Sequence, residues 1–198
     1  IESDEESENE DLPYYIEKLA SRIGSPTLIF CLDSGCANYD QMWLTTSLRG
    51  YLEGDMRVDI LTDGCHSGNA SGIVPSSTRI VRRLLDRLED PVTGKVHESF
   101  HVEIPAGRRK EAEELISVVG DFSKDFPFVE GATHVQAEDL TELYLNRTWR
   151  PTLCITGCGG IPDLKGGNVL RPYTTVKLAF RLPPGLTAET ARANLNKL

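Results

Sequence analysis

Residues 61–75 read LTDGCHSGNASGIVP and lie between a strand-like run and a helix-like run. The segment contains Gly64, Gly68 and Gly72, and glycine can adopt backbone angles that other residues avoid. It also contains one imidazole, that of His66. A glycine-shaped turn that presents a histidine can act in catalysis, and a solvated loop with an incidental histidine is the alternative. The sequence on either side decides between these two interpretations.

The sequence from residue 43 onward predicts an α+β domain. Strand-like patterns occur at residues 43–51, 56–62, 151–156 and 173–182. Helix-like patterns occur at residues 75–88, 105–119, 138–146 and directly after Thr187. Turn residues Glu53, Gly54 and Asp55 predict that the first two strands form a hairpin. The order of elements predicts a four-stranded antiparallel sheet with two helices on one face.

The first forty residues have a different pattern. Residues 2–11 are strongly acidic, and residues 12–20 have helical apolar spacing. Residues 27–32 form a short apolar run that predicts a buried strand, and Asp33 follows it directly. We therefore expect two domains, residues 1–40 and 41–198, the second carrying an insertion at about 90–147.

Composition narrows the range of functions. The net charge of -9 argues against a nucleic-acid partner, which requires a basic surface. No apolar run approaches the ~18 residues needed to span a membrane, and the acidic start is unlike a signal peptide. The number of cysteines is odd, which favours reduced thiols in a cytoplasmic protein. They are Cys31, Cys36, Cys65, Cys154 and Cys158.

Five motifs resemble those of the dizinc dipeptidases of the carnosinase and cytosolic non-specific dipeptidase type. This family belongs to a wider group that includes aminoacylase and glutamate carboxypeptidase. The motifs are CLDSG at 31–35, LTTSLRG at 44–50, HSG at 66–68 with VPSS at 74–77, RTWRP at 147–151, and GNVLRP at 167–172. Together they are far more specific than any one of them alone, and the resemblance covers essentially the whole chain.

The resemblance implies a two-domain metallopeptidase. Its catalytic α/β domain would hold two zinc ions, with manganese as the alternative metal, and residues 1–40 would be a fragment of that domain. Residues 41–198 would be the smaller lid domain, which forms a homodimer. The implied substrate is a dipeptide with a free C-terminal carboxylate.

The resemblance also assigns roles in the acidic N-terminal segment. Glu5 would be the general base, Glu6 would be a zinc ligand, and Asp33 would be a further zinc ligand. Carboxylates are hard oxygen ligands that suit such a metal site. The segment departs from the family pattern at Glu8 and Asn9, which stand where the family has Gly-Ser.

Three further residues receive roles by resemblance. His66 would enter the partner subunit's active site and stabilise the tetrahedral oxyanion, helped by Asn168. Arg181 would bind the substrate's C-terminal carboxylate, because a guanidinium matches a carboxylate with two hydrogen bonds.

The family's remaining metal ligands come from a His-x-Asp motif, an upstream Asp and a later His, which these 198 residues do not contain. We therefore expect the residues to be part of a longer enzyme and not to assemble a dizinc centre alone. Three alternatives stay open. They are an acyl-amino-acid deacylase or carboxypeptidase of the same group, a non-catalytic dimerisation module, and an inactive relative of the enzymes.

Overall fold

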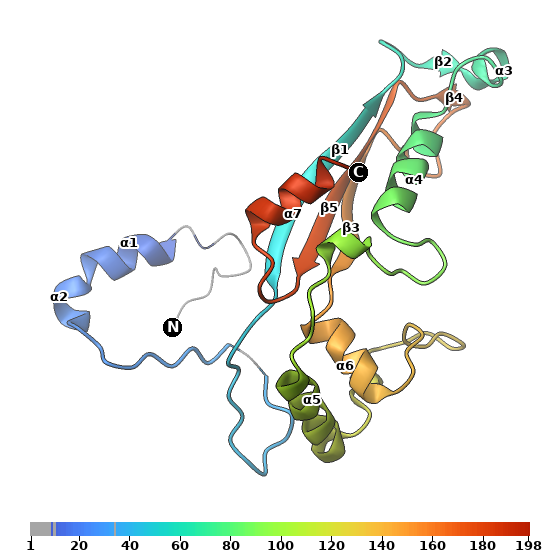
Figure 1. The fold of residues 1–198 in the computed structure, drawn as a ribbon. Coiled ribbons are helices and arrows are strands. Elements are labelled where there is room, and N and C mark those ends of the chain that lie inside the picture. The colour runs from blue at the N-terminus through green and yellow to red at the C-terminus, as the bar shows by residue number, and fades with distance from the viewer. Residues whose placement is uncertain (1–8, 10, 34) are drawn as a thin grey trace. The chain divides into compact units, whose positions relative to one another are not determined.

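The computed structural model describes residues 9, 11–33 and 35–198. The chain divides into two compact units, Ile1–Trp43 and Leu44–Leu198. Figure 1 labels the helices and strands, and short 3-10 helices also occur at Glu98–Phe100 and Phe122–Asp125. The labelled elements are α1 Asp11–Lys18, α2 Ala20–Ile23, β1 Gly50–Asp59, β2 Cys65–His66, α3 Ser67–Ala70, α4 Ser77–Leu88, α5 Ala106–Val119, α6 Leu140–Thr148, β3 Thr152–Gly159, β4 Val169–Leu170, β5 Tyr173–Leu182 and α7 Ala188–Leu195.

The first unit contains the predicted helix but not the predicted strand. Helices α1 and α2 cover the helical pattern, and Gly24 ends α2 with a φ of 70°. The strand expected at residues 27–32 is wrong, because this segment has no regular structure and Leu28, Ile29 and Phe30 are 65–72% exposed. A strand needs a neighbour for its backbone hydrogen bonds, and no other strand occurs among the described residues of this unit.

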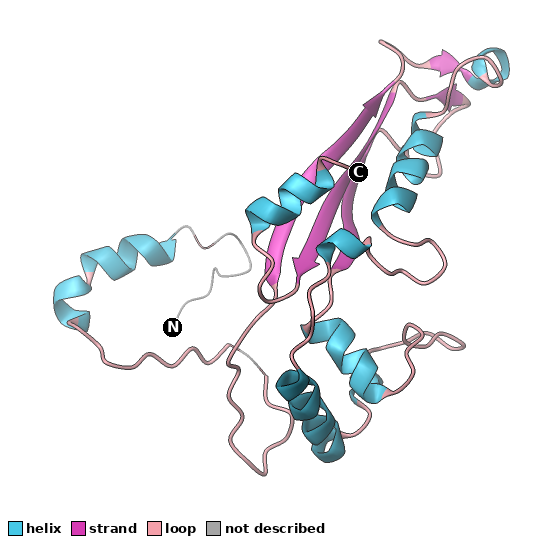
Figure 2. Cartoon of the chain, viewed as in Figure 1, coloured by secondary structure: helices cyan, strands magenta, loops and turns pink. Residues whose placement is uncertain are grey.

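The second unit is built on an antiparallel sheet of three strands in the order β1-β5-β3 (Figure 2). The predicted four-stranded sheet is therefore corrected to three strands. Strands β2 and β4 form a separate two-stranded ribbon. The mixed α and β composition and the antiparallel pairing agree with the sequence prediction.

The missing strand results from the predicted hairpin, which does not form. Strand β1 instead runs without a turn through Gly54 and pairs with β5 along its whole length, from Gly50 opposite Leu182 to Asp59 opposite Tyr173. Apolar and charged side chains alternate along β1, and this period of two suits one strand with one buried face. Ten paired positions on β5 outweighed the local turn preference of three residues.

Helices α4 and α7 cover the same face of the sheet, as predicted (Figures 1 and 2). Inward-facing residues of β5 pack against both helices, and the ring of Phe180 stacks on that of Phe100 at a centroid distance of 5.1 Å. The buried core consists of Val81, Leu88, Val96, Phe100, Val176, Leu178, Phe180, Leu182 and Ala191. The opposite face of the sheet, which carries the side chains of Tyr51, Lys177 and Arg181, is called the open face below.

The capping residues explain where the helices begin. Ser76 accepts a hydrogen bond from the backbone of Arg79 at the start of α4, and Thr187 accepts one from Thr190 at the start of α7.

In the insertion, Glu142 on α6 binds Arg109 on α5 and thereby joins the two predicted helices. No helix within the described ranges is long and apolar enough to cross a membrane.

Candidate functional site

The ribbon of β2 and β4 places His66 next to the segment that contains Asn168. His66 pairs with Val169, and the backbone N–H of Ser67 donates to the carbonyl oxygen of Asn168 at 2.9 Å. Gly64 permits this close pairing, because a Cβ at that position would lie 2.7 Å from a methyl group of Val169. Two residues that are about a hundred positions apart in sequence therefore meet in one corner, here called the histidine corner.

The turn after His66 fixes its imidazole ring. Nδ1 of His66 accepts a hydrogen bond from the backbone N–H of Gly68 at 3.2 Å. A neutral ring whose Nδ1 accepts carries its proton on Nε2, so Nε2 is the nitrogen that can donate. A Cβ on Gly68 would lie 3.0 Å from the ring, so glycine leaves room for this orientation. The side chains of His66 and Asn168 are both exposed, and the corner can present hydrogen-bond donors to a ligand.

Arg181 lies near the C-terminal end of β5, on the open face. Tyr51 is its direct neighbour on β1, and the guanidinium carbon lies 4.8 Å from the centre of the Tyr51 ring. The Tyr51 hydroxyl donates to Glu53, which also forms an ion pair with Lys177 at 3.0 Å. The hydrogen bond from Tyr51 holds the pKa of Glu53 below its usual value, and Lys177 adds to this; the same bond raises the pKa of Tyr51. The carboxylate of Glu53 is thus engaged by Tyr51 and Lys177 and not by Arg181, which remains exposed.

The histidine corner and Arg181 lie at opposite ends of β5. The corner precedes Tyr173, the first residue of the strand, whereas Arg181 is its next-to-last residue (Figure 1). At about 3.4 Å per residue, the eight steps from Tyr173 to Arg181 span about 27 Å. The fold therefore brings His66 and Asn168 together and keeps Arg181 away from both.

The predicted metal-binding and base residues are Glu5, Glu6 and Asp33, all in the first unit. Glu5 and Glu6 lie outside the described residues. Asp33 is exposed and lies in a turn of the first unit. Among the side chains that the structure describes, no three of the types His, Cys, Asp and Glu gather closely enough to hold a metal ion. The described residues by themselves therefore do not fit a dizinc centre.

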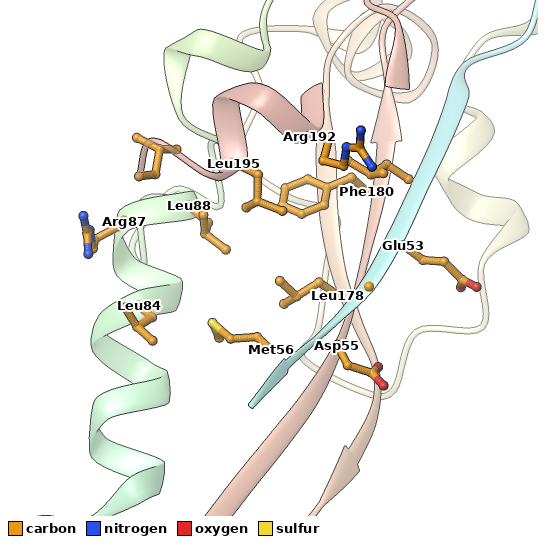
Figure 3. Close-up of a pocket in the computed structure, with 13 residues that line it drawn as sticks. Glu53, Asp55, Met56, Leu84, Arg87, Leu88, Leu178, Phe180, Arg192 and Leu195 are labelled. Carbon is orange, nitrogen blue, oxygen red and sulfur yellow. The ribbon is translucent and has the colours of Figure 1, made fainter. Parts of the chain in front are cut away.

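An apolar groove lies elsewhere in the second unit. Side chains from β1, β5, α4 and α7 line it, among them Met56, Leu84, Leu178, Phe180 and Leu195 (Figure 3). None of the predicted site residues that the structure describes belongs to its lining. The groove is therefore a hollow at the edge of the core and is separate from the candidate site.

Two residues near Arg181 received no role from the sequence. Tyr51 stacks on its guanidinium, and Arg49 donates to Thr152, the direct neighbour of Arg181 on β3. Arg49 was visible only as part of the motif at 44–50. The strand register reveals their proximity to Arg181, because it places Tyr51, Arg181 and Thr152 in one row across the three strands.

Comparison with known proteins identifies the family. Residues 46–198 match the family model described as the peptidase dimerisation domain. The chain therefore belongs to the peptidase dimerisation domain family, and the resemblance inferred from its motifs is confirmed. A comparison with curated protein sequences gives no match.

Three solved structures resemble the chain. An M20 family metallo-carboxypeptidase from Sulfolobus solfataricus has a TM-score of 0.56 and 22% identity, with 76% of this chain and 34% of that chain covered. A di-peptidase from Saccharomyces cerevisiae has a TM-score of 0.53 and 20% identity, with 75% and 31% covered. Human carnosine dipeptidase 1 has a TM-score of 0.55 and 21% identity, with 76% and 32% covered. At these identities the likeness is one of fold, and the chain spans about a third of each structure.

Proposed function

We propose that this chain is the lid region, with adjoining catalytic-domain residues, of a dizinc dipeptidase that acts as a homodimer. Its substrate is a dipeptide with a free C-terminal carboxylate, and we expect the 198 residues alone to be inactive. The family match supports a peptidase context. The observation that carries the proposal is the separation of the histidine corner from Arg181 along β5.

This separation argues for a site shared between two subunits. A dipeptide in extended conformation spans at most about 7 Å, whereas the strand that separates Arg181 from the histidine corner spans about 27 Å. One chain therefore cannot apply both to a single substrate. A two-fold dimer resolves this, because the histidine corner of one subunit can meet the Arg181 end of the other.

Each group has a distinct chemical role in such a site. His66 donates from Nε2 to the oxyanion that develops when water attacks the peptide carbonyl, and Asn168 supplies a second donor beside it. Arg181 binds the C-terminal carboxylate with its guanidinium, which Tyr51 orients by stacking. Selection of the free carboxylate and stabilisation of the transition state are thus divided between two ends of the lid.

The metal-dependent half of the mechanism rests on the first unit. Glu6 and Asp33 are the proposed zinc ligands, and Glu5 is the proposed general base. Of these three residues, Glu5 and Glu6 lie outside the described residues. The metal ions, zinc or alternatively manganese, would lower the pKa of a bound water and make it a nucleophile. All five cysteines are free and exposed, which supports a reducing compartment such as the cytoplasm.

The test is hydrolysis of a small dipeptide panel by the full-length protein that contains this chain. Each dipeptide is paired with its C-terminal amide, and each reaction is repeated with a chelator and after zinc or manganese is restored. We expect chelator-sensitive cleavage of the free dipeptides, with kcat/KM for the amides lower by about tenfold or more, because the amide loses the charged bond to Arg181.

Other outcomes would change the assignment. Release of acyl groups from acyl-amino acids without dipeptide cleavage would indicate a deacylase, because Arg181 serves any substrate with a free carboxylate. Absence of both activities would contradict the proposal and favour a non-catalytic dimerisation module.

A further inference from the structure

A row of side chains crosses the three-stranded sheet at the C-terminal end of β5. Tyr51 on β1 and Thr152 on β3 are the direct cross-strand neighbours of Arg181 on β5. All three side chains lie on the open face, because they alternate with the inward-facing residues. Arg49, the residue before β1, donates from Nη1 to the Thr152 hydroxyl at 3.1 Å. The guanidinium of Arg49 is therefore tied to the residue beside Arg181.

The position of Arg49 is fixed by the end of a helix. Its Nη1 also donates to the carbonyl oxygens of Asn146 and Arg150, at 3.4 and 3.3 Å, where α6 ends. Burial lowers the pKa of Arg49, and the charges of Arg181 and Arg147 lower it further. Two further positive charges therefore lie near Arg49; Arg49, Arg147 and Arg181 are called the arginine cluster below.

The carboxylates nearest to the arginine cluster in the described structure pair with other cations. Glu53 forms its ion pair with Lys177, and Glu142 on α6 binds Arg109 and Arg150. Within the part of the chain that the structure describes, no ion pair involves a member of the cluster. Clustered positive charge without a counter-charge favours a bound anion.

The cluster also has free hydrogen-bond donors. A guanidinium has five N–H groups, and among the described residues Arg49 has protein hydrogen-bond partners only at Nη1. Arg181 is held by the ring of Tyr51, which uses none of its N–H groups in a hydrogen bond. Both side chains can therefore present N–H pairs to carboxylates, and their positions are set before a ligand arrives.

We propose that Arg49 and Arg181 form one anion site that binds an acidic C-terminal residue, with Arg181 receiving the main-chain carboxylate and Arg49 the side-chain carboxylate. The proposal rests on the proposed function for the role of Arg181 and adds a substrate class, peptides that end in Asp or Glu. Arg49 is a specificity-determining residue in this site, because a neutral C-terminal side chain gives its guanidinium no partner.

The test measures binding to the 198-residue chain and therefore does not depend on turnover. The probes are N-acetylglutamate and N-acetylglutamine, which have nearly the same size and differ by one carboxylate. Binding is followed by NMR of the arginine Nε–H groups. We expect the glutamate probe to bind about tenfold more tightly, because its side-chain carboxylate accepts charge-assisted hydrogen bonds that the amide oxygen of glutamine does not.

Variants assign the preference to Arg49. We expect Arg49→Gln to remove the preference for glutamate, and Arg181→Gln to weaken binding of both probes. Arg57→Gln is the matched control. Arg57 lies on the open face of β1, opposite Thr175 near the start of β5, and it already forms an ion pair with Asp59. This substitution should change neither affinity.

Two results would overturn the inference. One is equal binding, or no binding, of the two probes by the unmodified chain, and the other is an unchanged preference in Arg49→Gln. Arg49→Lys protects the test against loss of folding, because it keeps one charge but loses the planar fork, and it should show a reduced preference with an unfolding temperature close to that of the unmodified chain. Failure of binding would leave the peptidase assignment standing, and failure of hydrolysis would leave the anion site standing.

Discussion

At the scale of single residues, His66 depends on a neighbour that has no side chain. The hydrogen bond from the backbone of Gly68 to Nδ1 selects which ring nitrogen donates, and the missing Cβ leaves space for the ring. A catalytic donor must be held close to its productive position, and a displacement of about 1 Å can cost about a hundredfold in rate. Gly68 is thus a positioning residue for the proposed oxyanion donor.

We predict that Gly68→Ala in the full-length enzyme lowers kcat by about a hundredfold and changes KM much less, because the added methyl group displaces the imidazole. Steady-state kinetics measures both constants. Gly107→Ala is the control, since a Cβ there meets nothing within 4 Å. Equal losses in the two variants, or a normal kcat in Gly68→Ala, would contradict the role given to this glycine.

At the scale of elements, strand pairing overruled local sequence signals. The residues Glu53, Gly54 and Asp55 predict a turn when taken alone, yet they lie in the middle of β1 because β5 offers a partner at every position. The apolar run at 27–32 is the reverse case, since it has strand-like residues but no described strand in its unit to pair with. A strand is defined by its neighbour as much as by its own residues.

The end of β3 depends on one close approach. Gly160 has a φ of 75°, and a Cβ at this position would overlap the carbonyl oxygen of Tyr173 at the start of β5. We predict that Gly160→Ala lowers the free energy of unfolding by at least about 2 kcal/mol, through backbone strain and loss of this contact. Urea unfolding of the 198-residue chain measures the change.

The adjacent glycine provides the matched control for this element. A Cβ on Gly159 would lie 3.8 Å from the side chain of Thr175, which is an ordinary contact. Gly159→Ala should therefore destabilise the chain much less than Gly160→Ala. Similar effects of the two substitutions would show that the close approach to Tyr173 is not what holds this end of the strand.

At the scale of the whole molecule, the length of β5 separates the two proposed halves of the site. If each site takes His66 from one subunit and Arg181 from the other, two different defective subunits can complement one another. In a mixed dimer of His66→Ala and Arg181→Ala subunits, one site contains both natural residues and the other contains neither. Random pairing then yields about one-quarter of the normal activity.

This prediction is tested with the full-length enzyme. The two variants are each expected to be nearly inactive, and activity should appear after they are unfolded and refolded together. A mixture of His66→Ala with Asn168→Ala is the control, because both residues belong to the same corner and no mixed site regains all its residues. Recovery in the control mixture, or none in the test mixture, would contradict the shared site.

Sequence alone determined the properties that depend on local pattern and on motifs. Periodicity and capping predicted α4, α5, α6, β3, β5 and α7 close to their observed bounds, because apolar spacing and caps act within one element. Five short motifs identified the family, and the family model confirms it. The motifs contain the candidate site residues His66 and Asn168, and the family resemblance added Arg181.

Only the tertiary structure decided how these parts are combined. It replaced a hairpin by one long strand and four sheet strands by three, because pairing energy comes from residues that are distant in sequence. It placed His66 beside Asn168 and both far from Arg181, and it brought Arg49 to the side of Arg181 through Thr152. Strand register and strand length determine these distances, and both are fixed only when the strands pair in the folded chain.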